Sequence, residues 1–526
     1  MTVSLLEGRR IHLRGTVQGV GMRPWIYRTA VDHGITGTVC NETSGVTIEA
    51  FGGTGALDAF LATLRISAPP AAVIDTFESE SITPRESNGF VILESRTGEE
   101  RRVSIPPELA TCDDCVAEIL DPRNRRYRYP FTNCTNCGPR FTIATGVPYD
   151  RSATTMARFA MCPECRREYD DPGDRRFHAQ PNACKVCGPT LSVLLDSSGH
   201  TLTAEDPIRF AADQIAAGLI VAVKGLGGFH LACDATSNDA VARLRARKRR
   251  DEKPFAVMVP DVEAAEPIVD LSVEARALLV SVERPIVIAP ARPGSSIAAE
   301  VAPRNSTLGV MLPYTPLHHL LLRDSGRPLV MTSANMSEEP IVYRNDEAMQ
   351  RLTGIADVIL AHDREIVTRC DDSVATVIAG RPLLLRRSRG YVPRAIDLNI
   401  DVKTAVLATG ALLKNTFCLA AGRRAWLGPH IGDLENEATR EAFEDAIERM
   451  ERFLGFRGEV VAHDLHPDYQ STHYAEARGG HRVAVQHHHA HVASTVAEHR
   501  LSGPVIGVAF DGTGFGTDGT AWGGEF

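Results

Sequence analysis

The distribution of apolar and polar residues divides the chain into segments with different periodicities. Residues 9–15 alternate between polar and apolar side chains, which predicts a strand, and a helix is expected after the glycines that follow. Residues 37–41 and 46–52 are typical of a hairpin. Longer αβ units begin further on, with an amphipathic helix over 206–217 and a buried strand over 219–223. These patterns predict a multidomain chain of mixed α+β and α/β type.

The last part of the chain has its own alternating pattern. Residues 404–421 predict a strand, a glycine turn and a second strand, and residues 438–454 predict an amphipathic helix. The apolar run at 504–510 predicts a buried strand that ends at a glycine-rich loop over 511–519.

Length, charge and targeting signals narrow the class of protein. A chain of 526 residues is too long for one core and should hold about three to four domains. The first ten residues are short and charged, and there is no apolar run of eighteen residues. We therefore expect no membrane segment and a reducing, cytoplasmic location. The net charge of -9 makes nucleic acid an unlikely main partner.

One cysteine pattern occurs twice, at an offset of fifty residues. Each copy reads Cys-x2-Cys, eighteen residues, Cys-x2-Cys, and the cysteines are Cys112, Cys115, Cys134 and Cys137, then Cys162, Cys165, Cys184 and Cys187. Four such sulfurs close a structural zinc site, so the repeat predicts two zinc ions. A disulfide framework is the weaker alternative, because it needs an oxidising compartment. The pattern leaves open whether each site forms within one copy or between the two.

The repeat also carries clustered arginines and aromatic residues, over 123–129 and 166–177. Such a mixture could hold nucleic acid by charge and stacking. The stronger interpretation is a zinc-stapled spacer whose arginines pair with nearby Asp and Glu.

A loop with two glycines follows the first predicted strand. Its backbone N–H groups, from Gln18, Gly19, Val20, Gly21 and Met22, could converge on a phosphate, with Arg23 adding a fixed positive charge. An ordinary turn is the alternative for the glycines alone. The full string Gly-x-Val-Gln-Gly-Val-x-x-Arg at 15–23, with Gly-x-Val-x-Asn at 37–41, resembles the acylphosphatase signature. The resemblance covers about residues 9–95 and implies a ferredoxin-like βαββαβ domain, with Arg23 binding phosphate and Asn41 positioning the attacking water.

A second group of candidate residues follows the buried strand at 219–223. Lys248, Arg249 and Lys253 belong to a basic run that leads into a strand, where they could line a triphosphate site rather than a solvated helix face. The polar strand-end residues Thr332, Ser333 and Asn335 are typical of a binding site rather than of a core. The elements Lys-Arg-x3-Lys-Pro, Thr-Ser-Ala-Asn and Arg-Arg-Ser-Arg-Gly resemble the YrdC family over roughly residues 200–392, and the resemblance adds Arg386 and Ser388 to the candidate ligands. The resemblance implies a twisted α/β domain that adenylates a carbamate with ATP and Mg²⁺.

His487 and His491 stand four residues apart and therefore share one face of a helix. Two imidazoles at this spacing can bind one divalent metal ion, and Asp511 could complete the ligand set. A histidine cluster on the surface is the alternative. The segment 400–526 resembles the start of the TsaD-like carbamoyltransferase domain, which has the actin/hexokinase-type ATPase fold. That fold needs a second lobe, and because the chain stops at Phe526 we expect it to be a fragment.

The domain order 9–95, 105–190, 200–392 and 400–526 resembles the HypF family of hydrogenase-maturation carbamoyltransferases. The resemblance implies that carbamoyl phosphate is hydrolysed, that the carbamate is adenylated with ATP, and that the carbamoyl group passes to the C-terminal cysteine of HypE for cyanide-ligand synthesis. A threonylcarbamoyl-adenylate or tRNA-modifying enzyme is a second interpretation, although it would not require the acylphosphatase signature. A zinc-dependent nucleic-acid-binding protein is a third.

Overall fold

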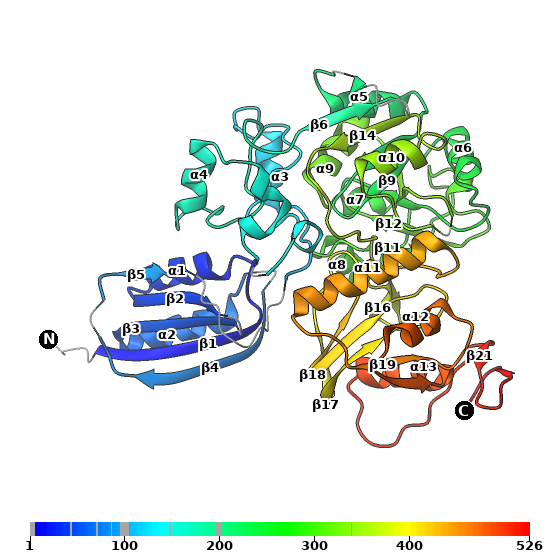
Figure 1. Ribbon diagram of the computed structural model, residues 1–526. Helices are drawn as coiled ribbons and strands as arrows, with labels where there is room; N and C mark the ends of the chain where they lie inside the picture. Colours follow the sequence, from blue (N-terminus) through cyan, green and yellow to red (C-terminus); the bar gives the residue numbers. More distant parts are fainter. Residues whose placement is uncertain are drawn as a thin grey trace. The chain divides into compact units, whose positions relative to one another are not determined.

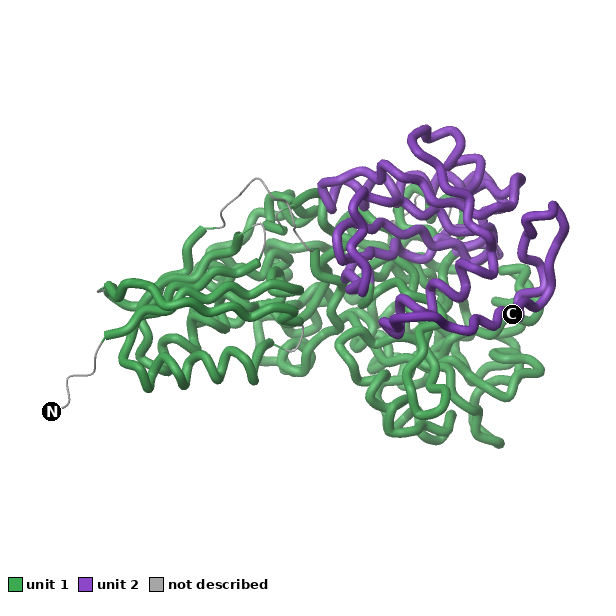
Figure 2. The backbone as a smooth tube through the Cα atoms, turned by 90° about the horizontal axis from the view of Figure 1, so that it is seen from below, with its two compact units in different colours: residues 1–334, 341–391 green, residues 335–340, 392–526 purple. Residues whose placement is uncertain are grey.

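The structure is a computed structural model that describes residues 6–526 except 43–44, 70–71, 86, 95–104, 148, 196–200, 203 and 338. The chain forms two compact units (Figure 2): Met1–Ala334 with Ile341–Tyr391, and Asn335–Pro340 with Val392–Phe526. Across the described ranges, no helix has both the length and the apolar composition that crossing a bilayer requires.

The first unit begins with a five-stranded sheet in the order β4-β1-β3-β2-β5 (Figure 1). Its elements are β1 (Leu6–Thr16), α1 (Met22–Asp32), β2 (Thr36–Glu42), β3 (Gly45–Gly53), α2 (Thr54–Ile66), β4 (Val73–Ile82) and β5 (Phe90–Ile92). The predicted βαββαβ order is therefore confirmed, and β5 is added in parallel beside β2.

The core of this domain lies between the sheet and its two helices. Leu57, Phe60 and Leu64 of α2 recur at helical spacing, and each is fully buried. They pack in one cluster with inward side chains of β1 and β3, such as Ile11 and Ile48. The glycine loop between β1 and α1 is held by this core at one end of the sheet.

The cysteine repeat contains little regular structure. Its two short helices, α3 (Asp113–Leu120) and α4 (Pro163–Asp170), have the same offset of fifty residues as the cysteines. Short 3₁₀ turns at Phe141–Ile143, Arg151–Ala153 and Thr155–Arg158 connect the copies. We call residues 105–190 the zinc hub.

An eleven-stranded mixed sheet completes the first unit, in the order β16-β15-β11-β12-β10-β13-β9-β8-β14-β6-β7. Its strands are β6 (Leu191–Leu194), β7 (Thr201–Leu202), β8 (Val221–Lys224), β9 (Phe229–Asp234), β10 (Ala256–Met258), β11 (Ile286–Pro290), β12 (Thr307–Met311), β13 (Leu329–Ser333), β14 (Val358–His362), β15 (Val374–Ile378) and β16 (Arg381–Arg386). Its helices are α5 (Pro207–Ala216), α6 (Asn238–Lys248), α7 (Val262–Ala265), α8 (Val273–Val280), α9 (Pro316–Ser325) and α10 (Asn345–Arg351). Every residue of β8 is buried, as expected for a strand covered on both faces.

The second unit is built on a four-stranded sheet in the order β18-β17-β19-β20. Its elements are β17 (Ile396–Ala408), β18 (Cys418–Leu427), α11 (Glu437–Leu454), β19 (Val460–Asp464), α12 (Gln470–Arg478), β20 (His481–Val485), α13 (His487–Glu498), β21 (Gly514–Phe515) and β22 (Ala521–Trp522). The predicted strand pair and the helix over 438–454 are confirmed.

The predicted buried strand at 504–510 is wrong. Only Ala509 makes a bridge, to Glu525, while Ile506 is 91% exposed and Phe510 is 86% exposed. An apolar run becomes a strand only where a neighbouring strand offers hydrogen bonds and an apolar surface covers its side chains. The described part of the chain provides neither for this segment.

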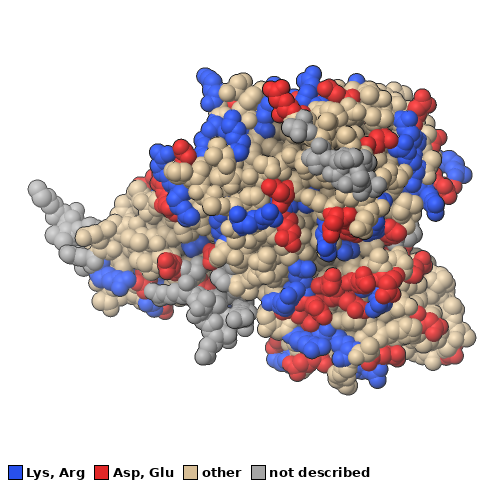
Figure 3. Space-filling view, turned by 45° about the horizontal axis from the view of Figure 1, so that its top comes forward, with Lys and Arg blue, Asp and Glu red and all other residues tan. Residues whose placement is uncertain are grey.

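Charged side chains of both signs are interspersed over the face drawn in Figure 3. Among the described residues on that face there is no continuous basic stripe of the kind that marks nucleic-acid binding.

Candidate functional site

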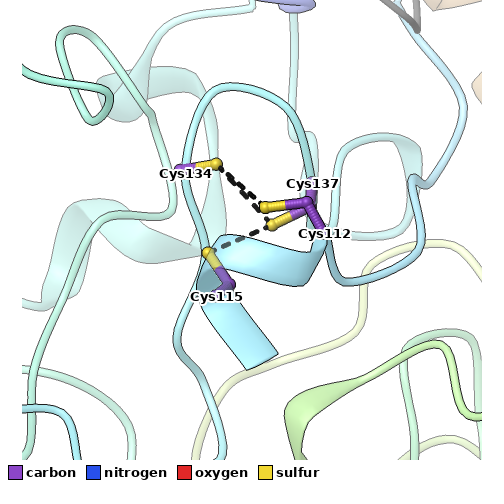
Figure 4. Close-up of side chains that lie close together, drawn as sticks. All are labelled: Cys112, Cys115, Cys134 and Cys137. Atoms are coloured by element: carbon purple, nitrogen blue, oxygen red, sulfur yellow. Dashed lines mark hydrogen bonds between the residues drawn. The ribbon is translucent and has the colours of Figure 1, made fainter. Parts of the chain in front are cut away.

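The eight cysteines of the zinc hub form two separate clusters, each within one copy of the repeat. In the first cluster, Cys112, Cys115, Cys134 and Cys137 point their sulfurs toward one another (Figure 4). The Sγ atoms of Cys112 and Cys134 are 3.6 Å apart, and those of Cys115 and Cys137 are 3.5 Å apart. In the second cluster, Cys184 lies 3.8 Å from both Cys162 and Cys187.

These distances fit tetrahedral zinc. A Zn–S bond of about 2.3 Å places the sulfurs of a regular tetrahedron ~3.8 Å apart. All four ligand atoms of each cluster lie within 4.8 Å of one another. Each cluster is therefore a closed site for one zinc ion, with no ligand position left for chemistry.

Arginines connect each cluster to the other copy of the repeat. Arg125, in the first copy, donates hydrogen bonds to the sulfurs of Cys162 and Cys165 at 3.5 and 3.2 Å. Arg175, in the second copy, donates to Cys115 at 3.3 Å and reaches Cys112 at 3.8 Å. Each cluster of thiolates therefore receives its cationic donor from the other copy.

The next arginine in each copy also pairs with a residue of the other copy. Arg126 forms two hydrogen bonds with the carboxylate of Glu168, at 3.0 and 2.5 Å, and Arg176 pairs in the same way with Glu118. These guanidinium groups are almost fully buried and hold the pKa of Glu168 down to about 2, against the burial of that carboxyl. The expectation that the arginines pair with acidic residues of the repeat holds for these positions.

The position after the shared aromatic residue differs between the copies. Arg128 in the first copy forms a two-pronged ion pair with Asp324 of α9, at 3.1 and 2.6 Å, which fastens the hub to the larger sheet. His178 takes the equivalent place in the second copy and lies beside Arg23 in the phosphate pocket. Both residues have a positive φ, of 57° and 51°. The same backbone conformation thus presents an anchor in one copy and a pocket residue in the other.

The glycine loop forms the floor of that pocket. Gly19 and Gly21 have φ values of 67° and 76°, a region that favours glycine. A Cβ on Gly19 would lie 2.8 Å from the ring of Pro106, and one on Gly21 would lie 3.1 Å from the hydroxyl of Thr135. The zinc hub can therefore lie this close to the loop only because positions 19 and 21 have no side chains.

Arg23 and Asn41 meet in this pocket. With its amide oxygen turned toward the guanidinium, Asn41 accepts hydrogen bonds from Nε and Nη2 of Arg23 at 3.1 and 3.2 Å. Burial lowers the pKa of Arg23, while the nearby Asp150 carboxylate opposes that shift. The guanidinium remains charged at neutral pH, because even a shifted arginine stays far above it. A cation and an amide side by side can hold an oxyanion and a water molecule.

Arg140 of the zinc hub closes the same pocket. Its Nε donates to the carbonyl oxygen of Gly19 at 2.9 Å, and its side chain is 1% exposed. The pocket is lined by the glycine loop on one side and by Thr135, Arg140 and His178 on the other. A second pocket shares Arg23 and His178 with it.

The structure brings only some of the predicted nucleotide-binding residues together. The buried Lys248 donates from Nζ to the carbonyl oxygen of Ser333 at 2.7 Å, and Thr332 is buried in β13. Ser388 is buried beside Cys370, and Arg386 ends β16. Arg249 and Lys253, in contrast, are exposed. Asn335 donates to the carbonyl oxygen of Glu339 at 2.5 Å, inside the short segment that groups with the second unit.

A buried polar network that sequence reasoning missed lies next to these residues. Ser333 pairs with His230 across β13 and β9, and His230 lies 2.9 Å from the carboxylate of Asp372. Arg389 donates to the other oxygen of Asp372 at 2.6 Å and lies over the ring of Tyr314. The guanidinium of Arg389 lowers the pKa of Asp372 although burial opposes this. The glycine-rich turn before His230 was the available sequence signal.

The histidines of α13 and Asp511 form a third candidate metal site, within the second unit. One oxygen of Asp511 lies 2.8 Å from Nε2 of His487 and 3.2 Å from Nε2 of His491. Asp464, at the end of β19, lies 2.6 Å from Nδ1 of His487. A carboxylate behind a ligating imidazole fixes its tautomer and orientation. Two imidazole nitrogens and a carboxylate suit a divalent transition metal. Asp464 was missed, although its place at the end of a buried strand was a signal.

Comparison with known protein families agrees with this architecture. The families described as acylphosphatase, HypF finger, telomere recombination (Sua5/YciO/YrdC) and HypF Kae1-like domain match residues 9–92, 111–144 with 161–194, 213–388 and 401–498, in that order.

Curated relatives and a solved structure match nearly the whole chain. Carbamoyltransferase HypF2 of Cupriavidus necator is 52% identical over 98% of this chain and 67% of its own length. Carbamoyltransferase HypF of Rhizobium leguminosarum is 49% identical over 98% and 66%. A solved full-length HypF, described as phosphate- and nucleotide-bound, has a TM-score of 0.94 and 46% identity, covering 99% of this chain and 68% of its own.

The fold and the sites define a multidomain enzyme that joins an acylphosphatase domain, a double zinc finger, a YrdC-like domain and a Kae1-like domain. The chain belongs to the HypF family of carbamoyltransferases. It spans about two thirds of the length of these relatives.

Proposed function

We propose that this chain takes part in a carbamoyl transfer that starts from carbamoyl phosphate. In the phosphate pocket, Arg23 binds the phosphoryl oxygens and Asn41 positions a water molecule. The water attacks phosphorus, the bond between phosphorus and the bridging oxygen breaks, and carbamate leaves with that oxygen. The pairing of Arg23 with Asn41 in an enclosed pocket is the observation that carries this proposal.

The YrdC-like domain then joins carbamate to ATP in the presence of Mg²⁺. A carbamate oxygen attacks the α-phosphorus, so that carbamoyl adenylate forms and pyrophosphate leaves. The candidate ligands are the buried Lys248 with Thr332 and Ser333, and Arg386 with Ser388. Arg249, Lys253 and Asn335 stay in the proposed set as groups for the outer phosphates.

The Kae1-like domain passes the carbamoyl group to the C-terminal cysteine of HypE, the acceptor for cyanide-ligand synthesis. The cysteine thiolate attacks the carbamoyl carbon, an S-carbamoyl cysteine forms and AMP leaves. His487, His491 and Asp511 would hold a divalent metal ion in this domain, and such an ion supplies charge to bind nucleotide phosphates. Transport of a carbamate and an acyl adenylate within one chain keeps both away from water.

One assay tests the relay. Carbamoyl phosphate and ATP are supplied together, and phosphate, pyrophosphate and AMP are counted separately. We expect phosphate release without ATP, and pyrophosphate only when both substrates are present. Pyrophosphate release that requires threonine and bicarbonate instead would favour a threonylcarbamoyl-adenylate enzyme. RNA binding that weakens steeply with salt, without pyrophosphate release, would favour a nucleic-acid-binding protein.

A further inference from the structure

Two buried cations lie at the carboxyl ends of neighbouring parallel strands. Lys224 ends β8, Arg364 follows the end of β14 by two residues, and these strands pair in parallel. The side chains are only 4% and 5% exposed. The carboxyl ends of parallel strands are the usual ligand-binding edge of an α/β sheet.

Neither cation forms an ion pair with a carboxylate among the described residues, although the charge of Asp363 acts on both from a distance. The Arg364 guanidinium makes no hydrogen bond to them, its Nε is buried without a partner, and it lies 5.0 Å from the centroid of the Phe131 ring. Lys224 donates from Nζ to two neutral oxygens, Oδ1 of Asn345 at 2.7 Å and the carbonyl of His362 at 3.2 Å. The carboxylate of Asp363, the residue directly before Arg364, is exposed and accepts hydrogen bonds from Thr190 instead.

This arrangement is unfavourable without a ligand. Burial, together with the charge of Arg364, lowers the pKa of Lys224 to about 8. Burial also lowers the pKa of Arg364, to about 10. Buried charges in proteins are normally paired, and the charge of Arg364 acts directly on Lys224, so two such cations without an ion pair indicate a site for an anion.

His362 adds a constraint on the chemistry of that anion. Its Nε2 lies 3.4 Å from the carbonyl oxygen of Gly225, which leaves Nδ1 as the acceptor nitrogen of a neutral ring. Nδ1 is buried and has no partner. Burial holds the pKa of His362 well below its usual value, so the ring stays neutral. An N–H donor on the ligand would satisfy this nitrogen.

We propose that Lys224, Arg364 and His362 bind a small carboxylate anion that carries an amino group, of the class to which carbamate belongs. The two cations hold the carboxylate oxygens, and Nδ1 of His362 accepts a hydrogen bond from the amino group. Tyr129 and Phe131 of the zinc hub supply the aromatic wall, with Phe131 packed edge-on against the His362 ring at 5.1 Å. The identity of the anion as carbamate rests on the proposed function, whereas the presence of an anion site does not.

Thermal unfolding of the purified chain tests the site, with sodium oxamate, a water-stable small carboxylate that carries an amino group, as the probe. Sodium pyruvate, which has the same shape without an N–H, and sodium chloride are the comparisons. Oxamate should raise Tm most, pyruvate less, and sodium chloride least. Arg364→Met should raise the anion-free Tm by at least ~2 °C, because an unpaired buried charge is removed, and should abolish the response to oxamate. His362→Phe should bring the response to oxamate down to that of pyruvate. Arg344→Met, at an exposed arginine paired with Asp346, is the matched control and should respond like the wild type.

A full oxamate response in Arg364→Met, or a lower anion-free Tm, would overturn the site. Enzymatic assay provides an independent check: the ratio of pyrophosphate formed to phosphate released should fall at least tenfold in Arg364→Met, and less in Arg364→Lys. If that ratio is unchanged while the wild type makes pyrophosphate, the site is wrong and the proposed function stands. If the wild type makes no pyrophosphate but shows an Arg364-dependent response to oxamate, the proposed function is wrong and the site stands.

Discussion

Arg125 and Arg175 occupy the same position in the two copies of the zinc repeat, and each donates hydrogen bonds to the cysteine sulfurs of the opposite copy. A zinc ion with four thiolates carries a net charge of about -2, which such donors disperse. Each metal site is thus completed by a residue of the other copy, and the two copies form one folding unit.

Replacing one of these arginines should weaken the zinc site of the opposite copy. In Arg125→Gln, we expect zinc at Cys162, Cys165, Cys184 and Cys187 to be lost to a chelator about 10 to 100 times more readily, as for other outer partners of metal ligands. Arg175→Gln should affect the first cluster instead. Zinc release, followed by mass spectrometry of alkylated cysteines, distinguishes the clusters. Arg123→Gln, at an exposed arginine that pairs with Asp121, is the control. Equal loss from both clusters would contradict this assignment.

Removal of Arg23 should stop carbamoyl phosphate hydrolysis without unfolding the protein. Loss of a preorganised charge at a phosphoryl group costs about 100-fold or more in rate. Burial lowers the pKa of Arg23, which means that the folded chain disfavours this charge. Arg23→Ala should therefore leave Tm nearly unchanged. Phosphate release from carbamoyl phosphate measures the effect. Arg28→Ala, at an exposed residue of the same helix, should behave like the wild type. Full activity in Arg23→Ala would remove Arg23 from the phosphate site.

The metal site of the second unit should depend on Asp464 as well as on its direct ligands. Asp464→Asn weakens the hydrogen bond that orients His487, and we expect metal affinity to fall about 10-fold to 100-fold. His491→Ala should lower it further. Calorimetric titration with Mn²⁺ and Zn²⁺ measures both. Equal affinity for Asp464→Asn and the wild type would show that the hydrogen bond does not support the site.

The lowered pKa of Lys224 predicts the direction in which the stability of the chain changes with pH. Its pKa in the folded chain is about 8, below the ordinary value of about 10.4. Between these values the unfolded chain binds the proton and the folded chain does not, so stability rises with pH over this window. We expect the free energy of unfolding of the wild type, relative to Lys224→Met, to rise by up to about 3 kcal/mol between pH 7.5 and 10.5. Urea unfolding without added anions measures it, and a constant difference would contradict the shifted pKa.

Local patterns predicted much of this fold. The alternation at 9–15, the glycines at 19 and 21 and the doubled cysteines are signals written in neighbouring residues. The pattern for the strand at 504–510 was misleading, because a strand also depends on a partner that the run itself does not encode. Lys253 was judged by the basic run around it, yet it is exposed, while the fully buried Lys248 of the same run reaches Ser333.

The missed site residues share one cause, since each acts on a residue far away in the sequence. Arg140 reaches the carbonyl of Gly19 across 121 positions, and His230 reaches Asp372 across 142. A single sequence gives no measure of such distances. The roles of Arg23, Asn41, His487, His491 and Asp511 remain predictions, although the structure places Arg23 beside Asn41 and the two histidines beside Asp511.

The contact between Arg140 and the glycine loop bears on what an excised amino-terminal domain would do. Without the zinc hub, the glycine loop would lose the residues that cover the pocket, and that side of the loop would face bulk water. Such a fragment would accept acyl phosphates of many shapes, since nothing would limit the group attached to the phosphate. Selectivity in the first step would then belong to the joined domains, and it would disappear when they are cut apart.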